Sequence, residues 1–176
     1  DAFLFKMYQA FGYHFDFIAI PIIKKRLRSD TSKVILDEAR PQLTEHLATR
    51  FRQKIGQNVN LLGEVVLGNG EADHRYHHYL EALEAPDINY ISVKISGIYA
   101  QTHALNYAES FPELVKRMSA LYQKAMDYPY VDENGVKRAK FVNLDMEEYK
   151  DAHFTLRLFK EVLNKPEFKN YSAGIV

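Results

Sequence analysis

The stretch Phe141-Val-Asn-Leu-Asp145-Met-Glu-Glu148-Tyr149 decides how the rest of this sequence is interpreted. Its first half is an apolar run that fits a buried strand, and its second half carries three carboxylates, the first of them Asp145. Barrel enzymes keep their active-site groups at the carboxyl ends of parallel strands. The stretch therefore predicts a buried strand that delivers acidic groups to a functional site.

Two earlier segments repeat this design. Residues 58–64 and 90–96 are short β-prone runs, and they carry the ionisable side chains Glu64 and Lys94. Helical patterns follow the three strand candidates, at residues 71–83, 111–128 and 146–163, with a hairpin at 129–140 and a further strand beginning at 173. Alternating strands and helices favour a parallel sheet, and polar strand ends favour a barrel over a doubly wound sheet.

The fold class we predict is α/β, the N-terminal part of a (β/α)8 TIM-like barrel preceded by helices. Residues 1–57 form the expected N-terminal helical segment, in which Pro21 bends or ends the first helix and residues 42–54 form a later one. Residues 58–176 form the expected first half of the barrel. Because the sequence opens on Asp1 rather than methionine, we expect it to be part of a longer protein.

Composition excludes several classes of function. The 176 residues include 23 basic and 23 acidic side chains, so no net field attracts nucleic acid or an anionic membrane. There is no cysteine, which excludes disulfides, thiolate metal sites and cysteine nucleophiles, and is most typical of a reducing compartment such as the cytoplasm. No apolar run approaches the roughly 20 residues that a membrane-spanning helix needs.

Three ionisable side chains are candidates for a site, and each also has a structural interpretation. Lys94 lies in an apolar strand, where its ammonium needs either a carboxylate partner or a ligand anion. Asp145 either serves a site or caps the helix that follows it, and Glu64 presents a similar choice. Because the three groups end successive strands, we expect them to converge at one barrel mouth.

Histidines offer a weaker signal. His74 and His78 have the i,i+4 spacing of a metal-binding pair, but no carboxylate accompanies them in a His-Glu-x-x-His arrangement. We therefore predict no metal site.

Several motifs in one order resemble the proline dehydrogenase domain of bacterial bifunctional proline utilisation enzymes. They are Asn60-Leu-Leu-Gly-Glu64, Asp87-Ile-Asn-Tyr-Ile-Ser-Val-Lys94-Ile-Ser96 with Ile98-Tyr99, and the stretch from Phe141 to Tyr149. The resemblance implies a distorted (β/α)8 barrel that holds FAD. It also implies hydride transfer from C5 of L-proline to flavin N5, which gives pyrroline-5-carboxylate, and electron delivery to a quinone at the membrane surface. Such an enzyme is cytoplasmic and peripheral at the inner membrane face.

The resemblance also implies roles for single residues. Lys94 pairs with the substrate carboxylate, and Asp145 lies beside the flavin and orders the site. Met146 and Val176 match positions that line the flavin, and Glu64 matches an acidic residue near the proline site. Groups that complete the family's site, among them paired arginines that clamp proline, fall beyond Val176.

The expected half-barrel leaves sheet edges and an inner face open. We therefore expect the fragment to self-associate or to cover the opening with its aromatic helix at residues 2–20, and to bind no FAD alone. Two alternatives remain from the sequence: another barrel enzyme that acts on a small acid, and a non-catalytic interaction module whose helices bind a partner chain.

Overall fold

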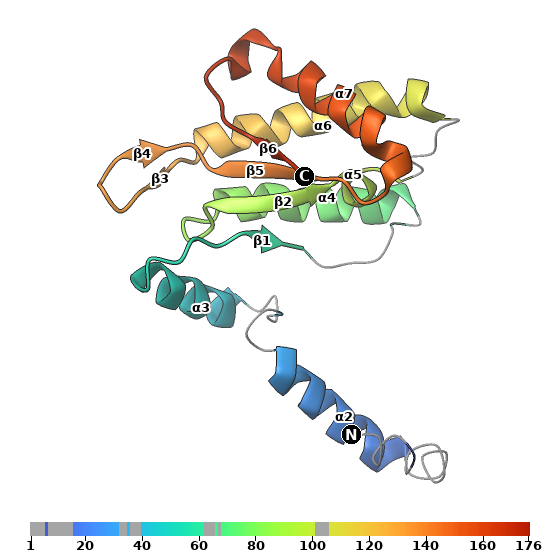
Figure 1. Ribbon diagram of the computed structural model, residues 1–176, viewed down its shortest axis with the longest axis vertical. Helices are drawn as coiled ribbons and strands as arrows, with labels where there is room; N and C mark the ends of the chain where they lie inside the picture. Colours follow the sequence, from blue (N-terminus) through green and yellow to red (C-terminus); the bar gives the residue numbers. More distant parts are fainter. Residues whose placement is uncertain are drawn as a thin grey trace. The chain divides into compact units, whose positions relative to one another are not determined.

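The computed structural model describes residues 6, 16–31, 35, 40–61, 66, 68–100 and 106–176. The chain divides into two compact units, residues 1–46 and 47–176, and the second contains the main sheet (Figure 1). The division at residues 57 and 58 that the sequence suggests stays a prediction. Among the described residues, no helix is both long and apolar enough to cross a bilayer.

Helix α2, Asp16–Thr31, continues through Pro21. Proline removes one backbone donor, but the helix continues past it to Thr31. Arg26 Nε donates to Asp30 Oδ2 at 3.1 Å, and Thr31 Oγ1 donates to Leu27 O at 2.7 Å. Pro21 therefore does not end the helix. Most of the aromatic helix expected at residues 2–20 lies outside the described residues.

Helix α3, Arg40–Arg52, leads into the sheet. Two residues after its end, Lys54 has a φ of 58°, in the left-handed region that commonly follows the last turn of a helix. Ile55 N then donates to Arg50 O at 3.1 Å, and the chain enters strand β1, Val59–Asn60.

The main sheet has four parallel strands in the order β1-β2-β5-β6. Strand β2 is Tyr90–Lys94, β5 is Phe141–Asp145 and β6 is Gly174–Ile175. Their order follows the order of the chain, as a TIM-like barrel requires, and four strands leave the barrel unclosed. The α/β class and the partial barrel are both confirmed.

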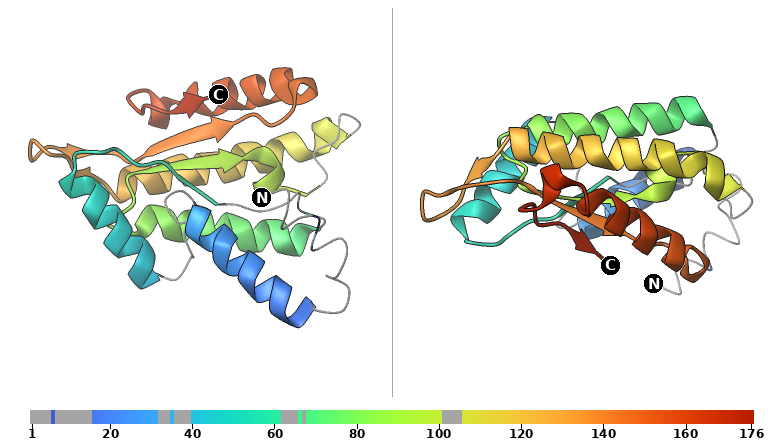
Figure 2. Two further views of the ribbon diagram at one scale, coloured as in Figure 1. Left: turned by 60° about the horizontal axis from the view of Figure 1, so that its bottom comes forward. Right: turned by 90° about the horizontal axis from the view of Figure 1, so that it is seen from above.

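Helices α4, Asn69–Glu84, and α6, Tyr107–Asp127, lie along one face of β2 and β5, and α7, Ala152–Leu163, packs against α6 (Figure 2). Side chains alternate between the two faces of a strand. The helix-facing positions of β2 and β5 are aliphatic and fully buried against leucines of the helices: Ile91, Val93, Val142, Leu144, Leu83, Leu114, Leu121 and Leu158. The opposite face carries the polar positions of the same strands.

Several boundaries differ from the sequence-based expectation, and two of the differences lie just after the carboxyl ends of β2 and β5. The strand expected through residue 96 ends at Lys94, and Ile95–Ile98 form the short helix α5. Gly97 lies close to α4 in this turn: a Cβ there would be 3.3 Å from Arg75 Cδ, and the arginine side chain would have to shift by a few tenths of an ångström. The helix expected from residue 146 begins only at Ala152, after a loop and the 3-10 turn Tyr149–Asp151.

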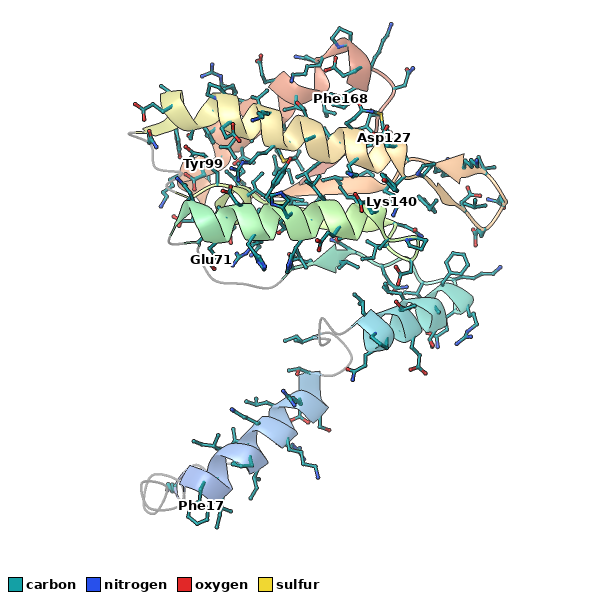
Figure 3. The ribbon with its side chains drawn as sticks, turned by 180° about the vertical axis from the view of Figure 1, so that it is seen from behind. Phe17, Glu71, Tyr99, Asp127, Lys140 and Phe168 are labelled. Atoms are coloured by element: carbon teal, nitrogen blue, oxygen red, sulfur yellow. The ribbon has the colours of Figure 1, made fainter. Side chains whose placement is uncertain are left out.

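A hairpin and a buried lysine precede β5, at the end of the sheet far from the strand carboxyl ends. Strands β3, Tyr130–Val131, and β4, Lys137–Arg138, form the expected hairpin. Lys140 follows it and is 1% exposed; its Nζ donates to Ala85 O, and its carbonyl accepts from Tyr171 Oη at 3.0 Å. Figure 3 shows Lys140 and Tyr99 toward opposite ends of the sheet.

Candidate functional site

A hollow of about 470 Å³ opens at the carboxyl ends of the strands. Its lining combines amide, ammonium, carboxylate and apolar groups from Asn60, Lys94, Asp145, Met146, Glu147 and Val176. Four of the five residues that the sequence singles out therefore line one hollow. The fifth, Glu64, lies outside the described residues.

Lys94 has a carboxylate partner in this hollow. Its Nζ lies 3.0 Å from Glu147 Oε1, and both side chains are about one-third exposed, at 30% and 35%. Ser96 Oγ donates to the other oxygen of the same carboxylate. Burial alone would raise the pKa of Glu147, but the hydrogen bonds from Ser96 and Lys94 lower it below its usual value. The positive charge of Lys94 is thus paired with the negative charge of Glu147, and the Lys94 side chain still lines the hollow.

Asp145 is held differently. Asn60 Nδ2 and Asn143 Nδ2 donate to its two oxygens, at 3.5 Å to Oδ2 and 2.5 Å to Oδ1. It does not cap α7, because the residue that precedes α7 is Asp151, six positions further along the chain. The helix-cap interpretation of Asp145 is therefore wrong, and its carboxylate belongs to the lining of the hollow.

Met146 and Val176 form an apolar border beside these charges. Met146 N donates to Val176 O at 2.8 Å, and Val176 N donates to Leu144 O at 3.1 Å, which extends the pairing of β5 and β6 beyond the strand ends. Both residues line the hollow, so apolar groups lie beside its charged ones.

Helix α5 packs against α4 and α6. Arg117 of α6 donates to Ile98 O at 2.7 Å, and forms ion pairs with Asp73 at 2.6 Å and Glu113 at 3.0 Å. Burial raises the pKa of Tyr79 to about 12, and a hydrogen bond with the Lys94 backbone opposes that shift. These contacts set the position of the turn that carries Ser96.

A second, water-sized cavity of about 30 Å³ lies beside the hollow and shares Asp145 and Glu147 with it. Tyr107 Oη donates to Asp151 at its border, and this hydrogen bond, together with burial, raises the pKa of Tyr107 to about 12. His74 and His78 lie elsewhere, on α4, with ring centroids 4.2 Å apart. Within the described ranges, no group of three or more His, Asp or Glu side chains could hold a metal ion.

Sequence reasoning missed four polar partners in the site: Asn60, Ser96, Asn143 and Glu147. Two signals could have identified some of them. Asn143 is two residues before Asp145 in the same strand and so shares its face. Glu147 belongs to the same acidic motif, but its pairing with Lys94 spans 53 positions of sequence and required the sheet register.

Comparisons with known proteins show which family the chain resembles over most of its length. The family model described as proline dehydrogenase matches residues 43–176. The structure of proline utilization A from Corynebacterium freiburgense is 38% identical, with a TM-score of 0.73 over 85% of this chain and 15% of that one. Proline utilization A from Bdellovibrio bacteriovorus, inactivated by N-propargylglycine, is 30% identical, with a TM-score of 0.73 over 88% of this chain and 17% of that one.

A mutant of proline utilization A from Bradyrhizobium japonicum shares the fold at 21% identity, with a TM-score of 0.63 over 89% of this chain and 16% of that one. No curated protein matches the chain. The chain thus spans only about one-sixth of the length of the matched solved chains.

Proposed function

The chain belongs to the proline dehydrogenase family, and on that premise we propose that it forms part of an FAD-dependent proline dehydrogenase that oxidises L-proline to pyrroline-5-carboxylate. The observation that carries this proposal is the hollow at the strand ends, which brings Lys94, Asp145, Met146 and Val176 together. An amino acid substrate needs a cationic group for its carboxylate and a shaped surface for its ring, and the hollow offers both kinds of surface.

The residues present fit one part of a flavin site. Met146 and Val176 supply adjoining apolar surface for a flat ring system, and Asp145 supplies an acceptor beside it. We propose that these three residues contact the flavin. When bound, FAD supplies the hydride acceptor, which this chain's own side chains do not offer.

Lys94 is proposed to orient the substrate through its carboxylate. An ammonium is a point charge and does not fix the plane of a carboxylate as a bidentate guanidinium does. Further hydrogen-bond donors are therefore needed to fix the plane of the substrate carboxylate. When substrate binds, the Lys94 ammonium either contacts both Glu147 and the substrate or leaves Glu147. Orientation is the main demand on the protein in such a reaction, because the bound reactants must be held within reach of each other.

Further parts of the proposal concern the complete enzyme. Its electron acceptor is a membrane quinone, and it works in the cytoplasm at the inner membrane face. Family membership supports both the quinone acceptor and the location. We assign no quinone contact to any described residue. Glu64 is proposed to lie near the substrate.

The test is kinetic and uses the full-length enzyme. Lys94→Ala should raise KM for proline and lower kcat/KM about 10- to 100-fold, which corresponds to about 1.4–2.7 kcal/mol of transition-state binding, while FAD stays bound. Lys150→Ala is the matched control, because that lysine pairs with Glu148 and is 62% exposed. Loss of flavin with unchanged proline kinetics in the remaining holoenzyme would contradict the role of Lys94.

A further inference from the structure

Two carboxylates line the hollow, and their partners differ in charge. Glu147 is paired with the ammonium of Lys94. Asp145 accepts from two neutral amides, one on each of two strands, and among the described residues no ion pair involves it. The two amides hold the Asp145 carboxylate in a defined plane at the edge of the hollow, where its strand neighbour Lys94 is paired with Glu147 instead.

Gly174 makes room for one of these amides. It lies opposite Asn143 in the pairing of β5 and β6, and a Cβ at Gly174 would be 2.3 Å from Asn143 Oδ1 and 2.9 Å from Phe141 Cε1. Real Cβ atoms essentially never come so close to another atom, so a side chain at this position would force Asn143 to move. A Cβ at Gly56 or Gly70, by contrast, would have no neighbour within 4 Å.

Asn143 has little freedom to move elsewhere. It is 4% exposed, and its amide lies between Gly174 on β6 and Asp145 at the end of its own strand. Close packing transmits such a displacement to the nearest partner. A methyl group at Gly174 would therefore disturb the hydrogen bond that orients Asp145, although Gly174 itself does not line the hollow.

We propose that Asn143 and Asn60 are positioning residues that fix the orientation of the Asp145 carboxylate, and that Gly174 reserves the space Asn143 needs. This inference rests on the proposed function for its kinetic consequence. Lys94 binds the substrate carboxylate and Asp145 orders the flavin side of the site, so a defect at Asn143 lowers turnover more than substrate affinity.

The experiment uses the full-length holoenzyme and four variants: Gly174→Ala, Asn143→Ala, the two combined, and Gly56→Ala as control. Gly174→Ala and Asn143→Ala should each lower kcat about tenfold or more, change KM less than about threefold, and shift the absorption bands of the bound flavin. The combined variant should lose less than the product of the two single losses, because both act through one contact. Gly56→Ala should match the parent enzyme.

Asn60→Ala covers the case in which Gly174→Ala does not fold, because Asn60 is exposed and its removal leaves the core unchanged. It should lower kcat less than Asn143→Ala does, since its hydrogen bond is the longer of the two. Unchanged kcat and flavin bands in the Asn143 and Asn60 variants, or fully independent effects of Asn143 and Gly174, would overturn the inference and leave the proposed function intact.

The two hypotheses fail separately. A parent protein that binds no flavin and does not oxidise proline would refute the proposed function. A crystal structure of Gly174→Ala then decides the inference without reference to activity: displaced Asn143 and Asp145 side chains support it, and an undisturbed pair of side chains refutes it.

Discussion

Replacing Arg117 with alanine should destabilise the second unit by about 2–6 kcal/mol. The largest part comes from the Ile98 carbonyl, which lies in a fully buried residue and would lose its donor, at a cost of about 1–3 kcal/mol. The guanidinium also lies over the rings of Tyr76 and Tyr99, 5.1 and 5.8 Å from their centroids, and each contact adds about 0.5–1 kcal/mol.

The two carboxylate partners of Arg117 contribute less. Asp73 and Glu113 are 49% and 35% exposed, so water solvates them once the arginine is gone, and together they account for about 0–1 kcal/mol. Asp73→Asn should consequently cost less than Arg117→Ala. Arg117→Lys should be intermediate, because an ammonium cannot reach the carbonyl and both carboxylates at once.

The assay is urea unfolding followed by far-UV circular dichroism at fixed protein concentration, with the midpoint and slope fitted for each variant. Lys116→Ala is the matched control: it is the preceding residue on α6, pairs with the same Glu113 at 3.6 Å, and is 78% exposed. It should change the free energy of unfolding by no more than about 0.5 kcal/mol. A loss below about 1 kcal/mol for Arg117→Ala would refute the claim that the Ile98 carbonyl depends on this arginine.

Two further outcomes are expected. The isolated chain should self-associate and should show no quenching of flavin fluorescence on titration with FAD; a monomer across a dilution series that binds one equivalent tightly would contradict this. The free energy of unfolding should fall as pH rises from about 10 to about 12. Burial raises the pKa of Tyr79 to about 12, so in this range the hydroxyl ionises in the unfolded chain before it ionises in the folded one. Tyr79→Phe should make this fall shallower in unfolding measurements from pH 9 to 11.5, and an unchanged slope would exclude Tyr79 as a contributor.

Strands are the part of this fold most readily predicted from sequence. The strand at residues 141–145 is predictable because an apolar run ends in polar residues, and the parallel order follows from the alternation of strands with helices. The end of β2 is harder to predict, because Ile95 continues the apolar pattern of the strand although it already belongs to α5. The start of α7 is misplaced by the sequence pattern for a similar reason, since Met146 and Glu147 have good helix propensity but lie in a loop.

The site is only partly predictable, because its polar contacts join different elements. Lys94 stands out as a charge in an apolar strand, but the identity of its partner depends on where Glu147 lies after the strand ends. The spacing of Asn143 and Asp145 places both on one face of the strand, but an amide in a buried strand is commonly only a satisfied polar group, so the spacing alone does not indicate a role. The significance of Asn143 becomes visible through the space that Gly174 leaves for it.

The β3–β4 hairpin provides an attachment point for spectroscopic probes. It precedes β5, whose five residues separate it from the hollow by roughly 15 Å at about 3.3 Å per residue. Asp132 anchors the turn by accepting from Asn134 N and Val136 N, both at 2.9 Å, while the side chain of Glu133 is exposed. Because the sequence contains no cysteine, Glu133→Cys would give this segment a single thiol for a dye or spin label, at a place where the label cannot obstruct the hollow.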